Sequence, residues 1–137
     1  ELVALFARAP IARSMGITLR YDDQGRARFD MPYHPGFDHA LGGVHGGVFA
    51  TLLDNAGWFV VAPFFERWIA TAEFSVRLHE PVSGEALCSV GSPVRVGRRT
   101  AVAEMEVRTI GGRLIATGAG TFTETSVLRQ LRGLLPI

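Results

Sequence analysis

The chain contains no lysine, because all 14 of its basic residues are arginine. This absence excludes a Schiff base, a lysine nucleophile and the phosphate-binding lysine of a P-loop. Cysteine is almost absent as well, since Cys88 is the only one. A single cysteine excludes a disulfide within the chain and any multi-cysteine zinc or iron–sulfur site, and we expect no metal. It also fits a reducing compartment, so the expected location is the cytoplasm.

An excess of charge and long apolar runs are also missing. The 14 basic residues oppose 13 acidic ones, a formal charge of +1, so no strong field points to nucleic acid or to acidic lipid. Uninterrupted apolar runs are only a few residues long, short of the roughly 20 needed to cross a bilayer. The N-terminal residues lack a basic segment followed by an apolar run, so we expect no signal peptide, no membrane and no nucleic-acid partner.

The length of 137 residues and the 47% hydrophobic content predict one domain over 1–137. An N-terminal helix is expected within 1–14, because Leu2, Leu5 and Phe6 have helical spacing, and Pro10 is expected to close it. The C-terminal tail, 126–137, is apolar and basic, and is expected to be either a terminal helix or an unstructured end.

Alternating apolar and polar residues predict a β-rich molecule. In 72–79, apolar residues recur at every second position from Ala72 to Leu78, the pattern of a half-buried strand. Glycine turns predict two hairpins, one at 22–25 and one at 111–112. Strands are expected at 17–23, 26–31, 72–79, 85–96, 99–110 and 113–124.

The segment GGVFATLLDNAGWFVVA, 46–62, is long enough for a helix of about 25 Å, and Pro63 ends it. Apolar residues fall on every side, so this helix is expected to be buried nearly all round. One long buried helix and a long antiparallel meander predict an α+β fold in which a curved sheet wraps around the helix. Such a sheet leaves one edge and part of the helix uncovered, and we expect a second copy to pair with it.

Asp54 is the most unusual residue, because it lies two turns inside this apolar helix. A carboxylate in apolar surroundings is costly unless it is paired or used. Three structural explanations compete with a catalytic one: Asp54 is a helix N-cap, lies on a wet stripe with Thr51 and Asn55, or binds an arginine from a neighbouring strand.

His45, Gly46 and Gly47 precede the helix and predict either a tight turn or an oxyanion site built from unpaired N–H groups. The eight residues from Gly46 to Asp54 span about 12 Å along a helix axis. An oxyanion donor and a base that act on one carbonyl must both lie near 3 Å from the reacting atoms. If both residues are catalytic, two antiparallel copies of the helix must therefore meet.

The runs HALGGVHGGVFATLLDNAGW, TAEFSVRLHEPVSGE and VGRRTAVAEMEV resemble the hotdog-fold acyl-CoA thioesterases, in particular the PaaI-like (phenylacetate-pathway) branch. The resemblance covers roughly 15–125, and its most specific part is HGG with an acidic residue nine positions after the histidine. It implies a curved antiparallel sheet wrapped around one long central helix. It also implies hydrolysis of a small or medium acyl-CoA, aryl or short to medium aliphatic, by a homodimer or a dimer of dimers.

The resemblance also implies roles for single residues. The Gly46 N–H would polarise the thioester carbonyl, with Gly47 beside it at the helix start. Asp54 of the other subunit would activate water as general base, or attack as nucleophile through a mixed anhydride. Thr71 falls where such enzymes often have a serine or threonine that helps to hold the water. His45 matches the motif histidine, and we expect it to organise the loop.

One position departs from the family pattern: His39 stands where relatives commonly have an asparagine that binds water or the substrate carbonyl. An imidazole can donate or accept in the same place, so a role is expected in altered form. The resemblance further implies a contact with the CoA phosphates near Gly97, where arginine is well suited to phosphate; the structural alternative is a solvated strand end. The candidates are Arg95, Arg98 and Arg99.

Two other functions remain possible on the same fold. One is hydration or dehydration of an acyl thioester, with His39 or His45 as the catalytic histidine. The other is a non-catalytic acyl-CoA-binding protein, which would tend to lose the acid that Asp54 supplies. No cofactor is expected, because CoA is part of the substrate. The sequence does not identify the acyl group, nor does it separate CoA from an acyl carrier protein.

Overall fold

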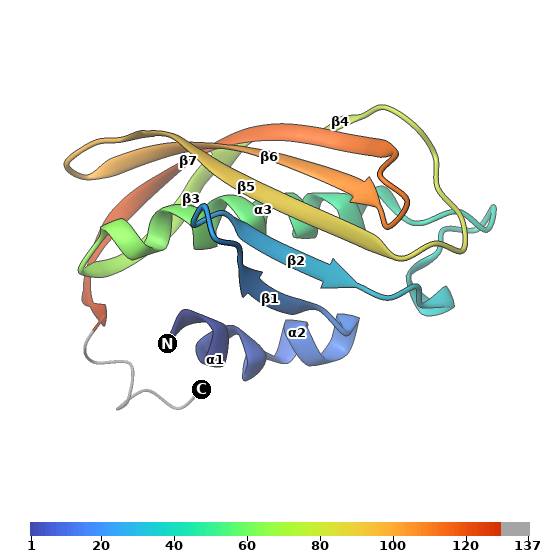
Figure 1. The fold of residues 1–137 in the computed structure, drawn as a ribbon, viewed down its shortest axis with the longest axis horizontal. Coiled ribbons are helices and arrows are strands. Elements are labelled where there is room, and N and C mark those ends of the chain that lie inside the picture. The colour runs from blue at the N-terminus through green and yellow to red at the C-terminus, as the bar shows by residue number, and fades with distance from the viewer. Residues whose placement is uncertain (130–137) are drawn as a thin grey trace.

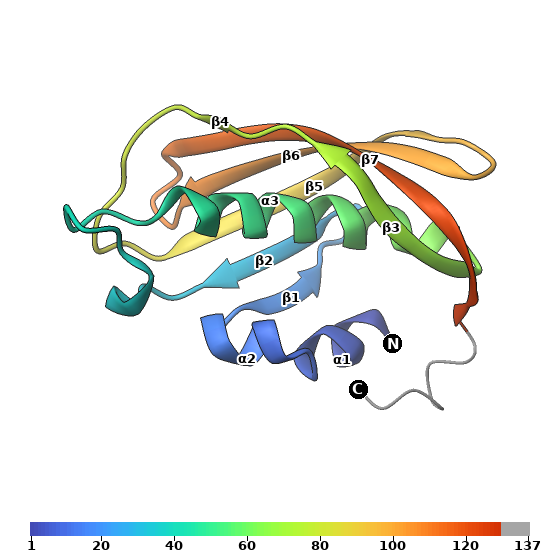
Figure 2. The same cartoon turned by 180° about the vertical axis from the view of Figure 1, so that it is seen from behind.

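The computed structural model describes residues 1–129. Seven strands form one antiparallel sheet in the order β1-β2-β5-β6-β7-β3, with the short β4 paired to β7. Figures 1 and 2 show the sheet curving around one long helix, α3 (Gly46–Val61). The strands are β1 (Thr18–Tyr21), β2 (Ala27–Met31), β3 (Arg67–Phe74), β4 (Arg77–Leu78), β5 (Leu87–Val96), β6 (Thr100–Thr109) and β7 (Leu114–Leu128).

Most strand predictions are confirmed to within a few residues. The alternation in 99–110 is reproduced in β6, where Ala101, Ala103, Met105 and Val107 are buried against α3 and its neighbours. The turn before β2 is built around Asp22, whose carboxylate accepts backbone N–H bonds from Gln24 and Arg26 and side-chain bonds from Arg26 and Arg28. Burial alone would raise the pKa of Asp22, but these hydrogen bonds hold it well below its usual range.

The prediction of one half-buried strand at 72–79 is wrong in two respects. The segment is divided between β3, which begins earlier at Arg67, and the two-residue β4. Three of its four apolar side chains are exposed, Ala72, Val76 at 38% and Leu78 at 56%, whereas Phe74 is half-buried against the core. The reason is position, because β3 and β4 pair with β7 at the edge of the sheet and no further strand of the described chain pairs beyond them.

The termini also differ from expectation. The N-terminal segment forms two helices, α1 (Leu2–Ala7) and α2 (Pro10–Met15), so Pro10 begins a second helix where it was expected to end the first. Proline suits this position, because the first N–H of a helix has no partner within the helix. At the other end, 126–128 belong to β7 and not to a tail, and 130–137 lie outside the described residues.

The long helix forms as predicted and is followed by a short 3₁₀ helix, η2 (Ala62–Phe64), that contains Pro63. The stretch Gly46–Phe64 is long and apolar enough, by composition, to cross a membrane, but it packs against the sheet and 56% of it is buried. Glycines allow close packing: a Cβ on Gly91 of β5 would lie 2.1 Å from the Ala56 carbonyl oxygen, and one on Gly57 would lie 2.5 Å from the Phe122 ring.

The expectation that α3 is buried nearly all round is wrong for the single chain. Residues spaced by three and four positions along one face stay exposed or half-exposed, and we call this face the open stripe. The sheet wraps around the opposite side of the helix. Along this face β3 contacts Asp54 through Thr71 and Trp58 through Trp68, and Figure 2 shows the rest of the face open. The open stripe consists of Gly47, Thr51, Asp54, Asn55 and Trp58.

Polar contacts fix the C-terminal end of α3. The Tyr21 hydroxyl donates to the Phe59 carbonyl at 2.7 Å, and burial raises the pKa of Tyr21 to about 12. The Arg129 guanidinium donates to the carbonyls of Ala62 and Phe65 at 2.7 and 2.6 Å. A cation at this end also interacts favourably with the helix dipole. The helix is therefore held in place by β1 and by the end of β7.

Candidate functional site

Asp54 lies on the open stripe, and its Oδ1 accepts a hydrogen bond of 2.7 Å from Thr71 Oγ1 on β3. Of the structural explanations, the wet stripe is confirmed, because Thr51 and Asn55 share this face. The N-cap explanation is wrong, since the helix begins eight residues earlier, at Gly46. No salt bridge found among residues 1–129 involves Asp54, so the arginine pairing is not observed either. The carboxylate is thus held by one hydroxyl and open to solvent.

The start of α3 presents one free donor. His45 is the N-cap, and its Nδ1 accepts the Gly47 N–H at 2.8 Å, while its carbonyl accepts the Val48 N–H at 2.9 Å. The Gly47 donor is therefore occupied, whereas the Gly46 N–H has no partner among residues 1–129. His45 thus caps α3, and the Gly46 N–H is the donor that stays available at the start of the helix.

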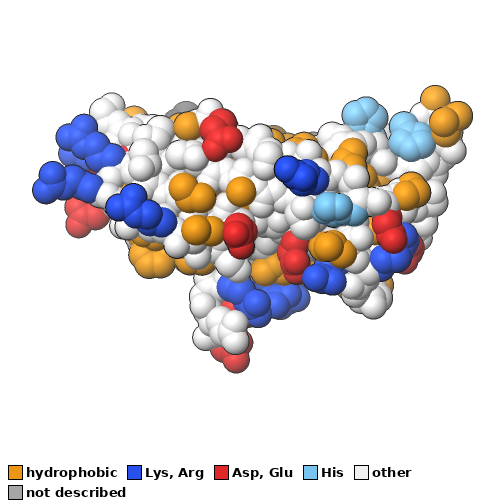
Figure 3. Space-filling view, turned by 90° about the horizontal axis from the view of Figure 1, so that it is seen from above, with side chains coloured by type: hydrophobic (Ala, Val, Ile, Leu, Met, Phe, Trp, Pro, Cys, Tyr) orange, Lys and Arg blue, Asp and Glu red, His pale blue; other side chains and the backbone are white. Residues whose placement is uncertain are grey.

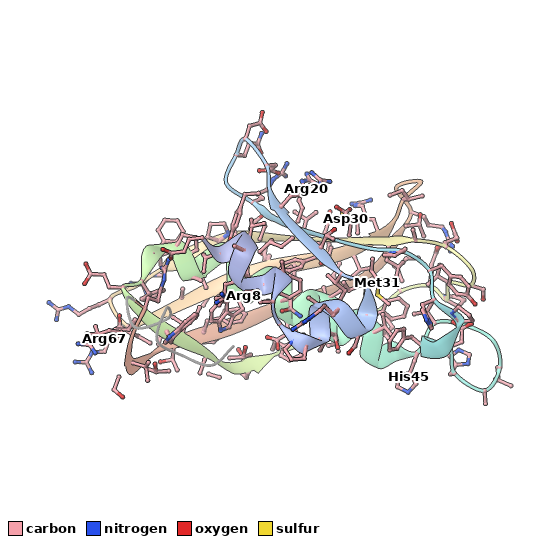
Figure 4. The ribbon with its side chains drawn as sticks, turned by 90° about the horizontal axis from the view of Figure 1, so that it is seen from below. Arg8, Arg20, Asp30, Met31, His45 and Arg67 are labelled. Carbon is pink, nitrogen blue, oxygen red and sulfur yellow. The ribbon has the colours of Figure 1, made fainter. Side chains whose placement is uncertain are left out.

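The loop before the helix is fixed by its own histidine. His39 Nδ1 accepts the Leu41 N–H at 3.1 Å, the His39 N–H donates to the Gly43 carbonyl at 2.8 Å, and Gly42 donates back to the His39 carbonyl. With Nδ1 accepting, a neutral His39 carries its proton on Nε2, which makes that atom a donor. Figure 4 shows this loop beyond the labelled His45, at the end of the molecule.

Two separate hollows contain the predicted residues. The first, which we call the helix-start hollow, has a volume of about 300 Å³ and contains His39 and Gly46. The second, the Asp54 hollow, has a volume of about 200 Å³ and is lined by Asp54, Asn55, Trp58 and Phe59. The two hollows share no residue, which agrees with the separation of about 12 Å along the helix. One chain therefore holds both halves of the predicted site but does not join them.

The arginine candidates lie at the Asp54 side of the molecule. Arg95 is near the end of β5, Arg98 and Arg99 form the turn before β6, and all three are exposed. In the sheet, Ala101 pairs with Phe122, which pairs with Thr71, so this turn lies two strands away from the Asp54 partner. Figure 3 shows a group of arginines at one end of this face, with others at its middle and near the histidines at the other end.

Another hollow, of about 620 Å³, lies on the outer face of the sheet. It is lined by polar side chains such as Arg77, Ser92 and Glu104 and contains none of the predicted site residues. Within 1–129, no three histidine, cysteine, aspartate or glutamate side chains gather closely enough to hold a metal ion. The outer hollow is therefore not a candidate active site, and the two hollows along α3 remain the candidates.

Sequence reasoning missed two residues near the helix start. His79 lines the helix-start hollow and lies 2.7 Å from the Thr117 hydroxyl through its Nε2. In the sequence it is only one more polar residue of an alternating strand, so no local signal distinguishes it. Leu41 is 92% exposed at the tip of the loop. A single leucine in a glycine-rich loop does not predict this exposure either.

Comparisons with known proteins identify the family. The model of the Thioesterase superfamily matches 41–116, more than half of the chain. A curated protein of Halobacterium salinarum, named "Putative esterase", is 31% identical over 121 residues, covering 79% of this chain and 80% of the relative.

Solved structures of thioesterases share the fold. A thioesterase family protein from Silicibacter pomeroyi is 29% identical, with a TM-score of 0.81 over 88% of this chain and 92% of its own. The PaaI protein of the E. coli phenylacetic acid degradation operon is 18% identical, with a TM-score of 0.81 over 91% of each chain, which shows the shared fold. The chain therefore belongs to the thioesterase superfamily: it is a thioester hydrolase with the hotdog fold of the PaaI-like proteins.

Proposed function

We propose that this thioester hydrolase acts on small or medium acyl-CoA molecules, aryl or short to medium aliphatic, as a homodimer with two composite active sites. The observation that carries the proposal is the separation of a free Gly46 N–H from a Thr71-held Asp54 along one helix. Neither hollow is complete alone, and the open stripe of α3 stays partly exposed beside β3. An antiparallel second copy of α3 on that stripe brings Gly46 of one chain to Asp54 of the other. Such dimers pair further into a dimer of dimers.

The composite site supplies the groups that hydrolysis needs. The Gly46 N–H, at the positive end of the helix dipole, binds the thioester oxygen as negative charge develops on it. Asp54 takes a proton from a water molecule as the water oxygen bonds to the carbonyl carbon. When the tetrahedral intermediate collapses, the C–S bond breaks and the thiolate leaves and takes up a proton. His39 donates from Nε2 to the water or to the carbonyl, in place of an asparagine amide.

Asp54 has an alternative role as nucleophile. Its carboxylate then bonds to the carbonyl carbon, CoA leaves as the thiolate, and water cleaves the resulting mixed anhydride. A single turnover in ¹⁸O-labelled water distinguishes direct water attack from a nucleophilic route in which water cleaves the anhydride at the Asp54 carbonyl carbon, because only that cleavage leaves the label in the Asp54 side chain. A water attack places the label in the free acid alone.

The experiment that tests the composite site uses two inactive variants. Gly46→Pro removes the N–H at the first helical position, where proline is tolerated, and His45 already has the extended backbone (φ −63°, ψ 137°) required before proline. Asp54→Asn removes the base. The matched control is Gly46→Ala, which keeps the N–H and places a Cβ only 3.3 Å from the flexible end of Leu78.

Purified Gly46→Pro and Asp54→Asn proteins are each expected to lose at least about 100-fold in kcat with phenylacetyl-CoA or hexanoyl-CoA. Refolded together, they form mixed dimers in which one of the two sites carries both intact residues. Half of the dimers are then mixed, so about a quarter of the wild-type activity returns. If the mixture stays as inactive as its parts, the site lies within one chain and the proposal is wrong. Incubation with an enoyl-CoA distinguishes hydratase activity by loss of the conjugated thioester absorbance.

A further inference from the structure

The Leu41 side chain projects into solvent from a loop that is well fixed. Leu41 is 92% exposed, although three hydrogen bonds hold the loop His39–Gly43, which we call the tip loop. An apolar side chain held in this way has a preformed contact surface and loses little conformational entropy when it packs against another molecule. Figures 1 and 2 both show the tip loop continuing past the start of α3.

The Asp54 hollow lacks a wall on the side of the open stripe. Its floor is aromatic: Trp58 packs on Phe59 with ring centroids 4.7 Å apart and on Trp68 at 5.9 Å. The Trp58 indole N–H donates to the Ile69 carbonyl at 2.9 Å, which fixes the ring in place. The hollow therefore offers a rigid apolar surface beside Asp54, and it is open at the side where a second copy would lie.

The antiparallel pairing of two α3 helices, proposed above, determines which part of the second copy faces the opening of the Asp54 hollow. Trp58 follows Asp54 by four residues, or about 6 Å along the helix. If Asp54 of one chain lies beside Gly46 of the other, Trp58 lies about 6 Å past the start of the partner helix, which is where the tip loop of the second copy lies. The occupant of the opening is therefore the tip loop of a second copy of this chain.

We propose that Leu41 of one copy packs over Trp58 of the other and closes the Asp54 hollow, so that this pair of side chains determines which acyl groups the enzyme accepts. The inference rests on the proposed function, because it needs the composite site. The Asp54 hollow has a volume of about 200 Å³ in the single chain, so once Leu41 closes it, it accommodates no more than an aromatic ring or a short aliphatic chain. Long fatty acyl chains are excluded, because Leu41 blocks the path past Trp58.

The kinetic test compares Leu41→Ala with the wild type on phenylacetyl-CoA and decanoyl-CoA. Leu41→Ala is expected to lower kcat/KM about 10-fold for phenylacetyl-CoA, as lost apolar contacts do, and to raise the decanoyl to phenylacetyl ratio at least about 10-fold. The matched control is Ile110→Ala, which shortens another exposed apolar side chain (73%) in a turn on the outer face and leaves the ratio unchanged. An unchanged ratio in Leu41→Ala overturns the inference.

A second test does not depend on activity. The double variant Leu41→Cys, Trp58→Cys, in a Cys88→Ser background, is oxidised with diamide and run on a non-reducing gel. Within one chain these positions are separated by at least the twelve residues from Gly46 to Trp58, about 18 Å of helix, beyond the reach of a disulfide. A disulfide-linked dimer is therefore expected to form only between copies. The pair Ile110→Cys, Trp58→Cys should not crosslink.

The two tests separate this inference from the proposed function. A dimer by sedimentation that does not crosslink through Leu41→Cys and Trp58→Cys overturns the packing, even if the wild type hydrolyses acyl-CoA. A crosslinked dimer whose wild-type counterpart does not hydrolyse any acyl-CoA keeps the packing and overturns the proposed function. A chain that remains a monomer overturns both.

Discussion

Thr71 Oγ1 donates a 2.7 Å hydrogen bond to Asp54 Oδ1 and so ties the edge strand β3 to the middle of α3. The bond satisfies one carboxylate oxygen and leaves Oδ2 without a partner among residues 1–129. A carboxylate held at one oxygen keeps a fixed orientation, and its second oxygen can accept a proton from water. Thr71 is therefore a positioning residue for Asp54.

Replacing Thr71 by valine should lower kcat about 5-fold and leave KM nearly unchanged, because the lost hydrogen bond orients Asp54 and is worth about 1 kcal/mol. Thr71→Ser keeps the hydroxyl and should restore most of kcat. Steady-state kinetics with hexanoyl-CoA separate the two parameters. Equal losses in the serine and valine variants would show that Thr71 acts through packing and not through its hydroxyl.

His45 should contribute to both stability and activity, because its ring caps α3 through the Gly47 N–H. His45→Ala is expected to lower the free energy of unfolding by about 1 kcal/mol in a urea titration and to lower kcat, since the helix start loosens around Gly46. His45→Asn offers an amide oxygen to the same N–H and should lose much less.

His34 provides the matched control, because its Nδ1 accepts the Gly36 N–H in the same way but caps only a 3₁₀ turn outside both hollows along α3. His34→Ala should leave kcat unchanged. If His45→Ala also left kcat unchanged while losing stability, the position of the Gly46 N–H would not depend on the cap.

If the exposed turn at Arg98 and Arg99 binds CoA phosphates, replacing both by alanine should raise KM about 10-fold with little change in kcat. The increase should shrink as salt is added, because salt screens exposed charges. Acyl N-acetylcysteamine thioesters carry no phosphate and should be hydrolysed as well by the variant as by the wild type. Arg8→Ala removes an exposed arginine at the C-cap of α1 and serves as control.

Asp22 should make the fold acid-sensitive, because hydrogen bonds from Arg26 and Arg28 hold its pKa well below its usual range. A carboxyl group with a lowered folded-state pKa stabilises the protein above the unfolded value of about 4, and loses that contribution as pH falls through the folded value. The Tm difference between wild type and Asp22→Asn should thus be largest near pH 7 and shrink below about pH 4.

Asp23→Asn, a change at an exposed neighbour in the same turn, should show no such trend. A Tm difference for Asp22→Asn that stayed constant down to pH 2 would mean that the charge of Asp22 contributes nothing to folding. Thermal unfolding of the wild type and of each variant at a series of pH values gives both Tm differences.

The long helix and its carboxylate were predictable because their signals are local. Gly46, Asp54 and Pro63 lie in one run of sequence, and their spacing alone sets the length of α3 and the separation of about 12 Å. The exposure of Val76 and Leu78 was not predictable, since a period of two shows which side chains share a face but not whether anything covers that face. The same limit hid the open stripe of α3.

The sequence also could not show that the Gly47 N–H is occupied while the Gly46 N–H has no partner among residues 1–129. The rotamer of the His45 side chain decides which N–H its ring accepts. The HGG motif is the same whichever of the two donors is left free. The resemblance named both glycines, whereas the structure shows that one of them is already satisfied. The prediction that Pro10 ends the N-terminal helix was wrong for a related reason. Proline occurs both just after the end of a helix and at the first position of the next one.

Gly57 and Gly91 affect the position of side chains on the opposite side of α3. Because these two positions cannot accept a Cβ without collision, the helix has one permitted rotation about its own axis and one permitted depth against β5. The direction of the Asp54 carboxylate therefore depends on these two glycines as well as on the Thr71 hydrogen bond. If Asp54 is the base of a symmetric dimer, as proposed, a methyl group at either glycine would shift the carboxylate and misalign both active sites at once.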